Sequence, residues 1–339
     1  MTKMKDILIS ENLSVGYGTN RKNQPVVILK DVNLNLRAGE LACLMGPNGI
    51  GKSTLIRTLA GLQSPLGGTV LLHGLAVHKQ TSYERARQIS VVLTDRVNAG
   101  NLNVYELIAL GRYPFTNWIM KLDDADNQAI SKAIEVTALS NILHQKLYQL
   151  SDGQLQKTMI ARALAQDGKV MILDEPTAHL DLNNRVEIMR LLRSLAHNHG
   201  KSILIATHEL DLALQLADKL ILLLPGGKMA EGIPEDLVLN GQLDETFQMK
   251  GYNLKTGKAE FIPEKSVKVA VKAEGYTYLW TKNALERNGY EVVDVQGNFD
   301  VLINTIENDT MPVWKVLSNE SENSFHTLKD LIDYLNNVE

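Results

Sequence analysis

One short stretch near the amino terminus constrains the fold of this chain more than any other feature. Residues 46–54, Gly-Pro-Asn-Gly-Ile-Gly-Lys-Ser-Thr, fit the template G-x-x-x-x-G-K-[ST]. An apolar run at residues 41–45 precedes them, and residues 54–62 carry apolar side chains at helical spacing. A strand, a glycine-rich loop and a helix in this order turn backbone N–H groups and the positive end of a helix dipole toward one point. The sequence therefore predicts a polyphosphate site.

The residue types of this loop suit a polyphosphate held together with Mg²⁺. Lys52 supplies a point charge for the β- and γ-phosphates, and the hydroxyl of Ser53 is placed to ligate Mg²⁺. Tyr17 ends an upstream strand, where its ring could stack on an adenine or pack against the strand, and its spacing does not decide between the two. The other residues expected to bind ATP are Gly46, Asn48, Gly49, Gly51 and Thr54.

Length and composition narrow the class of protein further. A chain of 339 residues exceeds what one core usually serves, which indicates a large domain and a smaller one. With 35 basic and 39 acidic side chains the net charge is −4, which argues against a nucleic-acid partner. The apolar run at residues 219–224 is far shorter than the ~20 residues of a membrane span. We therefore expect a soluble cytoplasmic chain that can still dock on a membrane protein.

Two later strands end in residues that suit phosphate chemistry. The apolar strand at residues 169–173 is followed by Asp174 and Glu175, and the strand at 202–206 by Thr207 and His208. In hydrolases with such a phosphate loop, the first acid holds Mg²⁺ and the second polarises the attacking water. We assign these roles to Asp174 and Glu175. Ligand-contacting groups gather where parallel strands end, so His208 is expected beside the γ-phosphate.

The middle of the chain changes to a helical period. Apolar residues recur at helical spacing between 104 and 150, with Pro114 breaking the first helix, which indicates a helical insertion over about residues 100–165. Ser151 follows, with Gln154 three residues further on, and this is the capping-box pattern. The alternative is a helix amino terminus that offers a hydroxyl and N–H groups to an anion. The spacing of Ser151 and Gln154 alone favours the capping box over the anion site.

Taken together, these motifs resemble the nucleotide-binding domain of ABC transporters. The segments that carry the resemblance are 46–54, 150–154, 170–175, 178–181 and His208. The resemblance implies an α/β fold of the P-loop NTPase type over residues 1–262, with a RecA-like core, an antiparallel β subdomain and a helical subdomain. It also implies a homodimer that encloses ATP, in which the loop of one copy faces the other copy's signature residues. Those residues and the D-loop aspartate are Ser151, Gly153, Gln154 and Asp181.

A closer resemblance is to the ATPase subunits of importers for iron-siderophore, haem and vitamin B12. Residues 109–115 and 232–236 look like segments of that group. The resemblance implies integral membrane permease subunits as partners, a solute-binding protein as an indirect one, and a place on the cytoplasmic face of the cell membrane. Two alternatives remain open: a soluble ABC-type ATPase not coupled to transport, and a nucleotide-gated regulator.

The chain departs from the family pattern in a few places. Thr94 stands where the family usually has a glutamine, and its hydroxyl could still ligate Mg²⁺ directly or through water. Asp152 replaces a glycine of the signature segment, and we expect its carboxylate to face away from phosphate because of charge repulsion. Residues 263–339 lie outside the resemblance and read as a small α+β domain whose role the sequence does not indicate.

Overall fold

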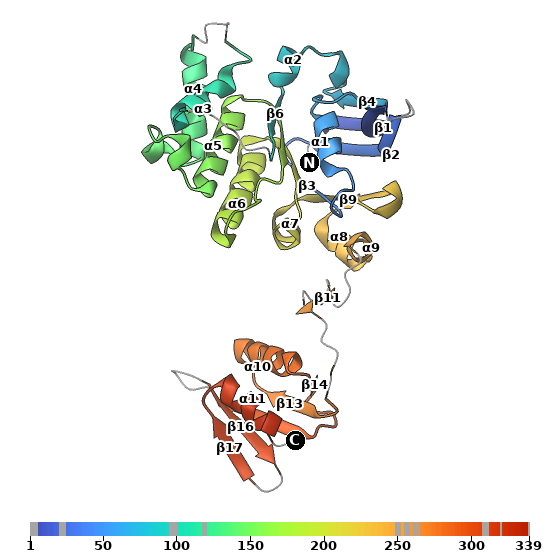
Figure 1. Cartoon of the computed structure of the whole chain (residues 1–339), viewed down its shortest axis with the longest axis vertical. Coiled ribbons are helices and arrows are strands. Elements are labelled where there is room, and N and C mark those ends of the chain that lie inside the picture. The colour runs from blue at the N-terminus through green and yellow to red at the C-terminus, as the bar shows by residue number, and fades with distance from the viewer. Residues whose placement is uncertain are drawn as a thin grey trace. The chain divides into compact units, whose positions relative to one another are not determined.

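The computed structural model describes residues 6–19, 25–94, 101–116, 121–247, 252–253, 258–259, 263, 265–306, 312–318 and 321–337. The chain divides into two compact units, residues 1–248 and 249–339, whereas the sequence-based boundary lies at residues 262/263. Figure 1 labels their helices and many of their strands. Within the described ranges, the helices are all too short or too polar to cross a membrane.

A six-stranded sheet in the order β10-β9-β3-β8-β7-β6 forms the centre of the first unit. The strands from β9 to β6 are parallel, and β10 pairs antiparallel with β9. Strands β3, β7 and β8 are buried along their whole length, the pattern of a sheet covered on both faces. The strands are β3 (Leu41–Met45), β6 (Ile89–Val92), β7 (Val170–Asp174), β8 (Ser202–Ala206), β9 (Lys219–Leu223) and β10 (Met229–Gly232).

Helices connect these strands and pack on the sheet. The first, α1 (Lys52–Leu59), contacts β7 and β8, and α6 (Leu182–His199) contacts β3 and β8. After β8 comes α7 (Leu210–Leu216), and α8 (Pro234–Leu239) and α9 (Gln242–Phe247) follow β10. Because the parallel strands all end at one edge of the sheet, the residues that follow β3, β7 and β8 meet there.

A four-stranded antiparallel sheet, in the order β2-β1-β4-β5, completes the core of the first unit. Its Leu8 and Leu34 belong to the same buried cluster as Leu55 of α1 and Ile172 of β7. This sheet is the antiparallel β subdomain that the family resemblance implies. Its strands are β1 (Asp6–Thr19), β2 (Pro25–Arg37), β4 (Gly67–Leu72) and β5 (Leu75–Ala76), followed by the 3₁₀ turn η1 (Val77–Lys79) and α2 (Ser82–Ala86).

Three helices form the helical insertion. Both α3 and α4 pack against α5, and the 3₁₀ turn η2 (Leu110–Arg112) ends the first helix just before Pro114. The helices are α3 (Val104–Ala109), α4 (Asp124–Val136) and α5 (Asp152–Ala165), with the 3₁₀ turns η3 (Ser140–Ile142) and η4 (Leu147–Gln149) between the last two.

A buried ion pair ties this insertion together. Arg112 Nε lies 2.8 Å from Asp126 Oδ1, and both side chains are less than a tenth exposed. Arg112 also donates from Nη1 to the Ala165 carbonyl at 2.9 Å, at the end of α5. Burial raises the pKa of Asp126, but hydrogen bonds from the Asp123 N–H and from Arg112 outweigh it, so the pKa lies below its ordinary value. The pair therefore joins α4 to α5 in the charged state.

Replacing Asp126 with alanine is expected to destabilise the fold by about 3–5 kcal/mol, because Arg112 is left as a buried, uncompensated charge. Urea unfolding followed by far-UV circular dichroism measures this. The pKa of Asp126 is lower in the folded protein than in the unfolded chain. The ionised carboxylate therefore stabilises the fold fully above the ordinary aspartate pKa of 3.8, and this stabilisation is lost as the pH falls through the pKa of Asp126 in the folded protein. Asp124→Ala, an exposed change in the same helix turn, is the matched control. Equal stability of the two variants would contradict the role of the pair.

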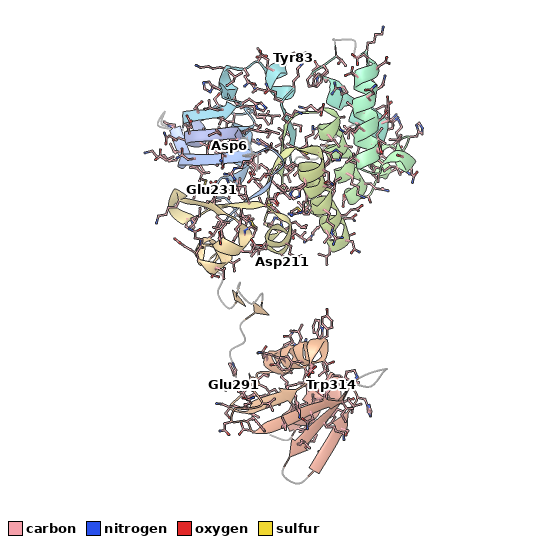
Figure 2. All side chains as sticks on the ribbon, turned by 180° about the vertical axis from the view of Figure 1, so that it is seen from behind. Asp6, Tyr83, Asp211, Glu231, Glu291 and Trp314 are labelled. Carbon is pink, nitrogen blue, oxygen red and sulfur yellow. The ribbon has the colours of Figure 1, made fainter. Side chains whose placement is uncertain are left out.

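The second unit is a small α+β domain. Its sheet has the order β14-β13-β15-β16-β17, with β13 parallel to both neighbours and the remaining pairs antiparallel. Val269 and Ile303 of the sheet pack with Leu285 of α10 and Leu331 of α11. Trp314, labelled in Figure 2, donates from Nε1 to Thr281 Oγ1 at 2.8 Å. The elements are β11 (Tyr252–Asn253), β12 (Lys258–Ala259), β13 (Lys268–Lys272), α10 (Gly275–Arg287), β14 (Glu291–Val293), β15 (Val301–Ile306), β16 (Val313–Ser318), β17 (Ser321–Phe325) and α11 (Leu328–Asn337).

Candidate functional site

The phosphate loop lies between β3 and α1, as the sequence predicts. Gly46 has φ 151° and Gly51 φ 112°, backbone conformations that L side chains rarely adopt. A Cβ on Gly46 would lie 2.6 Å from the Leu223 carbonyl oxygen, and one on Gly51 would lie 2.6 Å from a methyl group of Ile28. Only glycine fits at these two positions. Asn48 and Gly49 form the exposed tip of the loop.

Lys52 is the buried cation of this loop. Its Nζ donates to the carbonyl oxygen of Gly46 at 2.8 Å and to that of Pro47 at 3.3 Å. Burial lowers the pKa of Lys52, and the charges of Glu175 and Asp174 offset part of that effect. The ammonium group is thus held inside the loop, across from the two acids.

The next two residues of α1 differ in exposure. Ser53 is exposed at the start of the helix, whereas Thr54 is buried. Thr54 Oγ1 lies 3.1 Å from the hydroxyl of Tyr17, so the two groups share a hydrogen bond. Tyr17 itself is 57% exposed. The structure therefore brings Tyr17 to the loop and leaves most of its ring accessible.

The two acids after β7 occupy different environments. Asp174 is buried, and among the described side chains its Oδ1 has no hydrogen-bond partner. Glu175 has φ 49°, a left-handed conformation that costs a non-glycine residue energy, and its N–H donates to the Ala206 carbonyl at 2.9 Å. Thr94 donates from Oγ1 to the Asp174 carbonyl at 3.0 Å. Strands β6 and β8 thus fix the backbone of both acids.

His208 meets Glu175 where β8 ends. His208 Nδ1 and Glu175 Oε2 lie 2.7 Å apart, and the imidazole is 56% exposed. Two neighbours of this pair went unassigned in the sequence analysis: Glu209 approaches the other ring nitrogen, and Arg185 of α6 contacts Glu209. Glu209 adjoins His208 in sequence, but the contact of Arg185 depends on how α6 and α7 pack, so no sequence signal identifies it.

The signature segment forms the cap of α5. Ser151 Oγ accepts from the Gln154 N–H at 3.3 Å, and the Ser151 N–H donates to Gln154 Oε1 at 3.0 Å. The capping box predicted from sequence is therefore present. Ser151 is nonetheless exposed, and within the described ranges no hydrogen bond joins Ser151 or Gly153 to the phosphate loop of the same chain.

Gly153 packs against the helix that follows the D-loop. Asp181 caps α6 by accepting from the Asn184 N–H at 2.8 Å, and Asn184 Nδ2 donates back to Asp181 Oδ2 at 2.9 Å. A Cβ on Gly153 would lie 2.6 Å from Asn184 Oδ1. The signature glycine and the D-loop aspartate are thus linked through one side chain.

Gly153→Ala is expected to destabilise the fold by about 1–2 kcal/mol, because the new methyl group displaces the Asn184 side chain. Thermal unfolding should show a lower melting temperature, by a few degrees. The double variant Gly153→Ala/Asn184→Ser has room for the methyl group and should recover most of the loss. An unchanged melting temperature in the single variant would contradict this packing.

A cavity of about 220 Å³ lies beside the two acids. Thr94, Asp174 and Glu175 line it on the sheet side, and Asp152 of α5 and His179 of the D-loop complete it. Asp152, expected to face away from phosphate, thus lines a cavity next to the acids of its own chain. The structure brings together the phosphate loop, the two acids and His208 at one sheet edge, and the signature cap lies on the helical insertion.

A phosphate loop after β3, an Asp–Glu pair after β7 and a histidine after β8 define a nucleotide-binding cassette of the P-loop NTPase class, and the predicted α/β fold is confirmed. A sequence model of the family described as ABC transporter matches residues 29–178. An AAA domain model overlaps it at residues 143–214. The ABC transporter ATP-binding protein MJ0873 of Methanocaldococcus jannaschii is 37% identical over 291 residues, covering 85% of this chain and 98% of that protein. The chain therefore belongs to the family of ABC transporter ATP-binding proteins.

Other relatives carry more specific names. The ferric enterobactin transport ATP-binding protein FepC of Escherichia coli is 33% identical over 254 residues, which cover 74% of this chain and 90% of that protein. Further relatives are named for import of iron(3+)-hydroxamate, petrobactin and cobalamin. These names belong to transport systems, and they do not support the alternative of an ATPase unconnected with transport.

Two further comparisons concern the fold and the C-terminal unit. The cassette MJ0796, solved as a dimer in a post-hydrolysis state with ADP and Pi, superposes with a TM-score of 0.55 at 26% identity, covering 63% of this chain and 93% of that one. Residues 266–336 match a family described as the iron ABC transporter C-terminal domain. The segment whose role the sequence left open therefore resembles a domain of iron ABC transporters.

Proposed function

We propose that this chain is the ATP-hydrolysing subunit of a membrane importer whose cargo is an iron-siderophore, haem or cobalamin. The assignment of ATP hydrolysis rests on the 2.7 Å contact between Glu175 and His208, at the sheet edge where the phosphate loop opens. The names of the relatives and the match of residues 266–336 support the transport part and favour an iron chelate.

The residues at this sheet edge have separate roles in binding and hydrolysing ATP. Lys52 and the loop N–H groups bind the β- and γ-phosphates, and the exposed ring of Tyr17 stacks on the base. Glu175 orients and polarises the attacking water, and His208 holds the carboxylate of Glu175 in place and contacts the γ-phosphate. Most of the rate gain therefore comes from positioning and charge.

Two side chains at the same sheet edge, those of Asp174 and Ser53, fit a magnesium ion. The buried Oδ1 of Asp174 has no partner among the described residues, and Ser53 presents an exposed hydroxyl at the loop end. Carboxylate and hydroxyl oxygens are the ligands Mg²⁺ prefers. When bound, the ion would neutralise phosphate charge. Thr94 already donates its proton to the Asp174 carbonyl, so it would take part through an oxygen lone pair or a bridging water.

Two copies complete the site. Ser151 is exposed, Gln154 is partly exposed and Gly153 is buried against Asn184, and among the described residues none of the three has a hydrogen bond to the phosphate loop of its own chain. In a symmetric dimer they would close the γ-phosphate side of the partner's loop, with Asp181 at the shared boundary. The dimeric relative MJ0796 supports this arrangement.

An aromatic patch on the first unit suits a permease partner. Tyr83, labelled in Figure 2, stacks with Tyr113 at 6.3 Å between ring centroids, and both rings are about half exposed. Arg87 and Arg112 lie over the neighbouring ring of Phe115. Exposed aromatic groups backed by arginine are enriched at protein interfaces. We place the permease contact here, at the cytoplasmic face of the cell membrane, with a solute-binding protein delivering the cargo.

Uptake measurements test this function. Cells that lack this chain should regain ATP-dependent uptake of ⁵⁵Fe-siderophore, haem or cobalamin when wild-type protein is supplied, and should not regain it with Glu175→Gln. Each cargo is offered separately, so that the one transported identifies the importer. Uptake that does not depend on this chain for any of the three would contradict the proposal.

A further inference from the structure

His208 lies between two carboxylates that belong to different segments. Its Nδ1 is 2.7 Å from Glu175 Oε2, and its Nε2 is 3.6 Å from Glu209 Oε1. The imidazole is 56% exposed, so packing alone does not fix the ring. Of the two carboxylates, Glu175 is at hydrogen-bond distance from the ring, and Glu209 is at ion-pair distance from its other nitrogen.

Glu209 is itself held by an arginine from another helix. Arg185 Nη1 lies 2.9 Å from Glu209 Oε1 and 3.1 Å from Oε2, and the carboxylate side chain is only 16% exposed. Arg185 Nε donates at 2.7 Å to the carbonyl oxygen of Leu180, the residue before Asp181. One guanidinium group therefore joins the D-loop to the carboxylate beside His208.

The shape and charge of arginine suit this place. A guanidinium group can bind a carbonyl and a carboxylate at once, which a lysine ammonium on a flexible stem does less well. Its charge also offsets that of Glu209, whose neighbour His208 contacts Glu175 on the side where a polyanionic nucleotide would bind.

We propose that Arg185 is a positioning residue, which acts through Glu209 to hold the ring of His208 toward Glu175. The inference rests on the proposed ATPase function. It adds a link from the D-loop to the histidine, formed by Arg185, Glu209 and the Leu180 carbonyl.

Single variants of the full chain, assayed with its permease, test the link. Arg185→Ala should lower kcat by about 10- to 100-fold while KM for ATP changes less than about 3-fold, because the ring is misplaced and the phosphate loop is untouched. Arg185→Lys should recover part of the loss. Glu209→Gln, which keeps the size of the side chain, should lower kcat similarly and serves if Arg185→Ala folds poorly. Arg190→Ala, an exposed change on the same helix, should have no effect.

A double-mutant cycle separates positioning from a general structural defect. In a His208→Ala background Arg185→Ala should cause no further loss of single-turnover rate, because its effect passes through the missing ring. A second loss of the same size would overturn the inference, and so would full kcat in Arg185→Ala. Both of these results leave the ATPase assignment unaffected, provided that the wild-type chain hydrolyses ATP. A wild-type chain that does not hydrolyse ATP with its permease would overturn both.

Discussion

Replacing Glu175 with glutamine is expected to lower the rate of ATP hydrolysis by about 10²- to 10⁴-fold, or roughly 3–5 kcal/mol of barrier, while ATP still binds. The amide keeps the size of the side chain and its contact with His208, but it cannot polarise the attacking water. Single-turnover hydrolysis by the chain with its permease measures the rate, and equilibrium dialysis with labelled ATP measures binding.

The matched control for this change is Glu235→Gln, an exposed glutamate in the first turn of α8. It should leave both rate and affinity unchanged. Hydrolysis that persists at the wild-type rate in Glu175→Gln would show that another group activates the water.

Replacing Lys52 with alanine should weaken ATP binding by roughly 2–3 kcal/mol, or about 30- to 150-fold, because the hydrogen bonds from a cation to the phosphates are lost. At low ATP concentration, the rate of hydrolysis should fall by at least the same factor as the affinity. The matched control is Lys30→Ala, the same substitution at an exposed lysine of β2, which should leave ATP binding unchanged.

Thermal unfolding of Lys52→Ala separates binding from folding. Lys52 also ties the loop through the Gly46 and Pro47 carbonyls, so some loss of stability without nucleotide is expected. An affinity equal to that of wild type in a folded variant would exclude Lys52 from the phosphate site.

Local patterns account for what the sequence predicted well. The glycines at 46 and 51 are required by backbone angles and close contacts that the template encodes. The buried runs of β3, β7 and β8 read directly as strands, and the order of their terminal residues predicted which groups share the sheet edge. The capping box at Ser151 is equally local, since both partners lie within one helical turn.

What the sequence did not predict depends on contacts between distant segments. Arg185 reaches Glu209 only because α6 and α7 pack side by side. Asp152 lines a cavity with Glu175 because the helical insertion lies against the end of β7. Strand β17 was missed because its residues, Ser-Glu-Asn-Ser-Phe, are mostly polar, and its pairing with β16 supplies the stability that its own composition lacks.

The central claim is that each ATP site is composed of two chains, and a mixing experiment tests it most directly. Glu175→Gln alone and Ser151→Arg alone should both be nearly inactive. In a heterodimer of the two, one site combines both defects and the other is intact. With random pairing half of the dimers are mixed, so hydrolysis should return to about a quarter of the wild-type rate. If mixing restores nothing although mixed dimers form, the signature residues do not act on the partner's ATP, and the composite site is wrong.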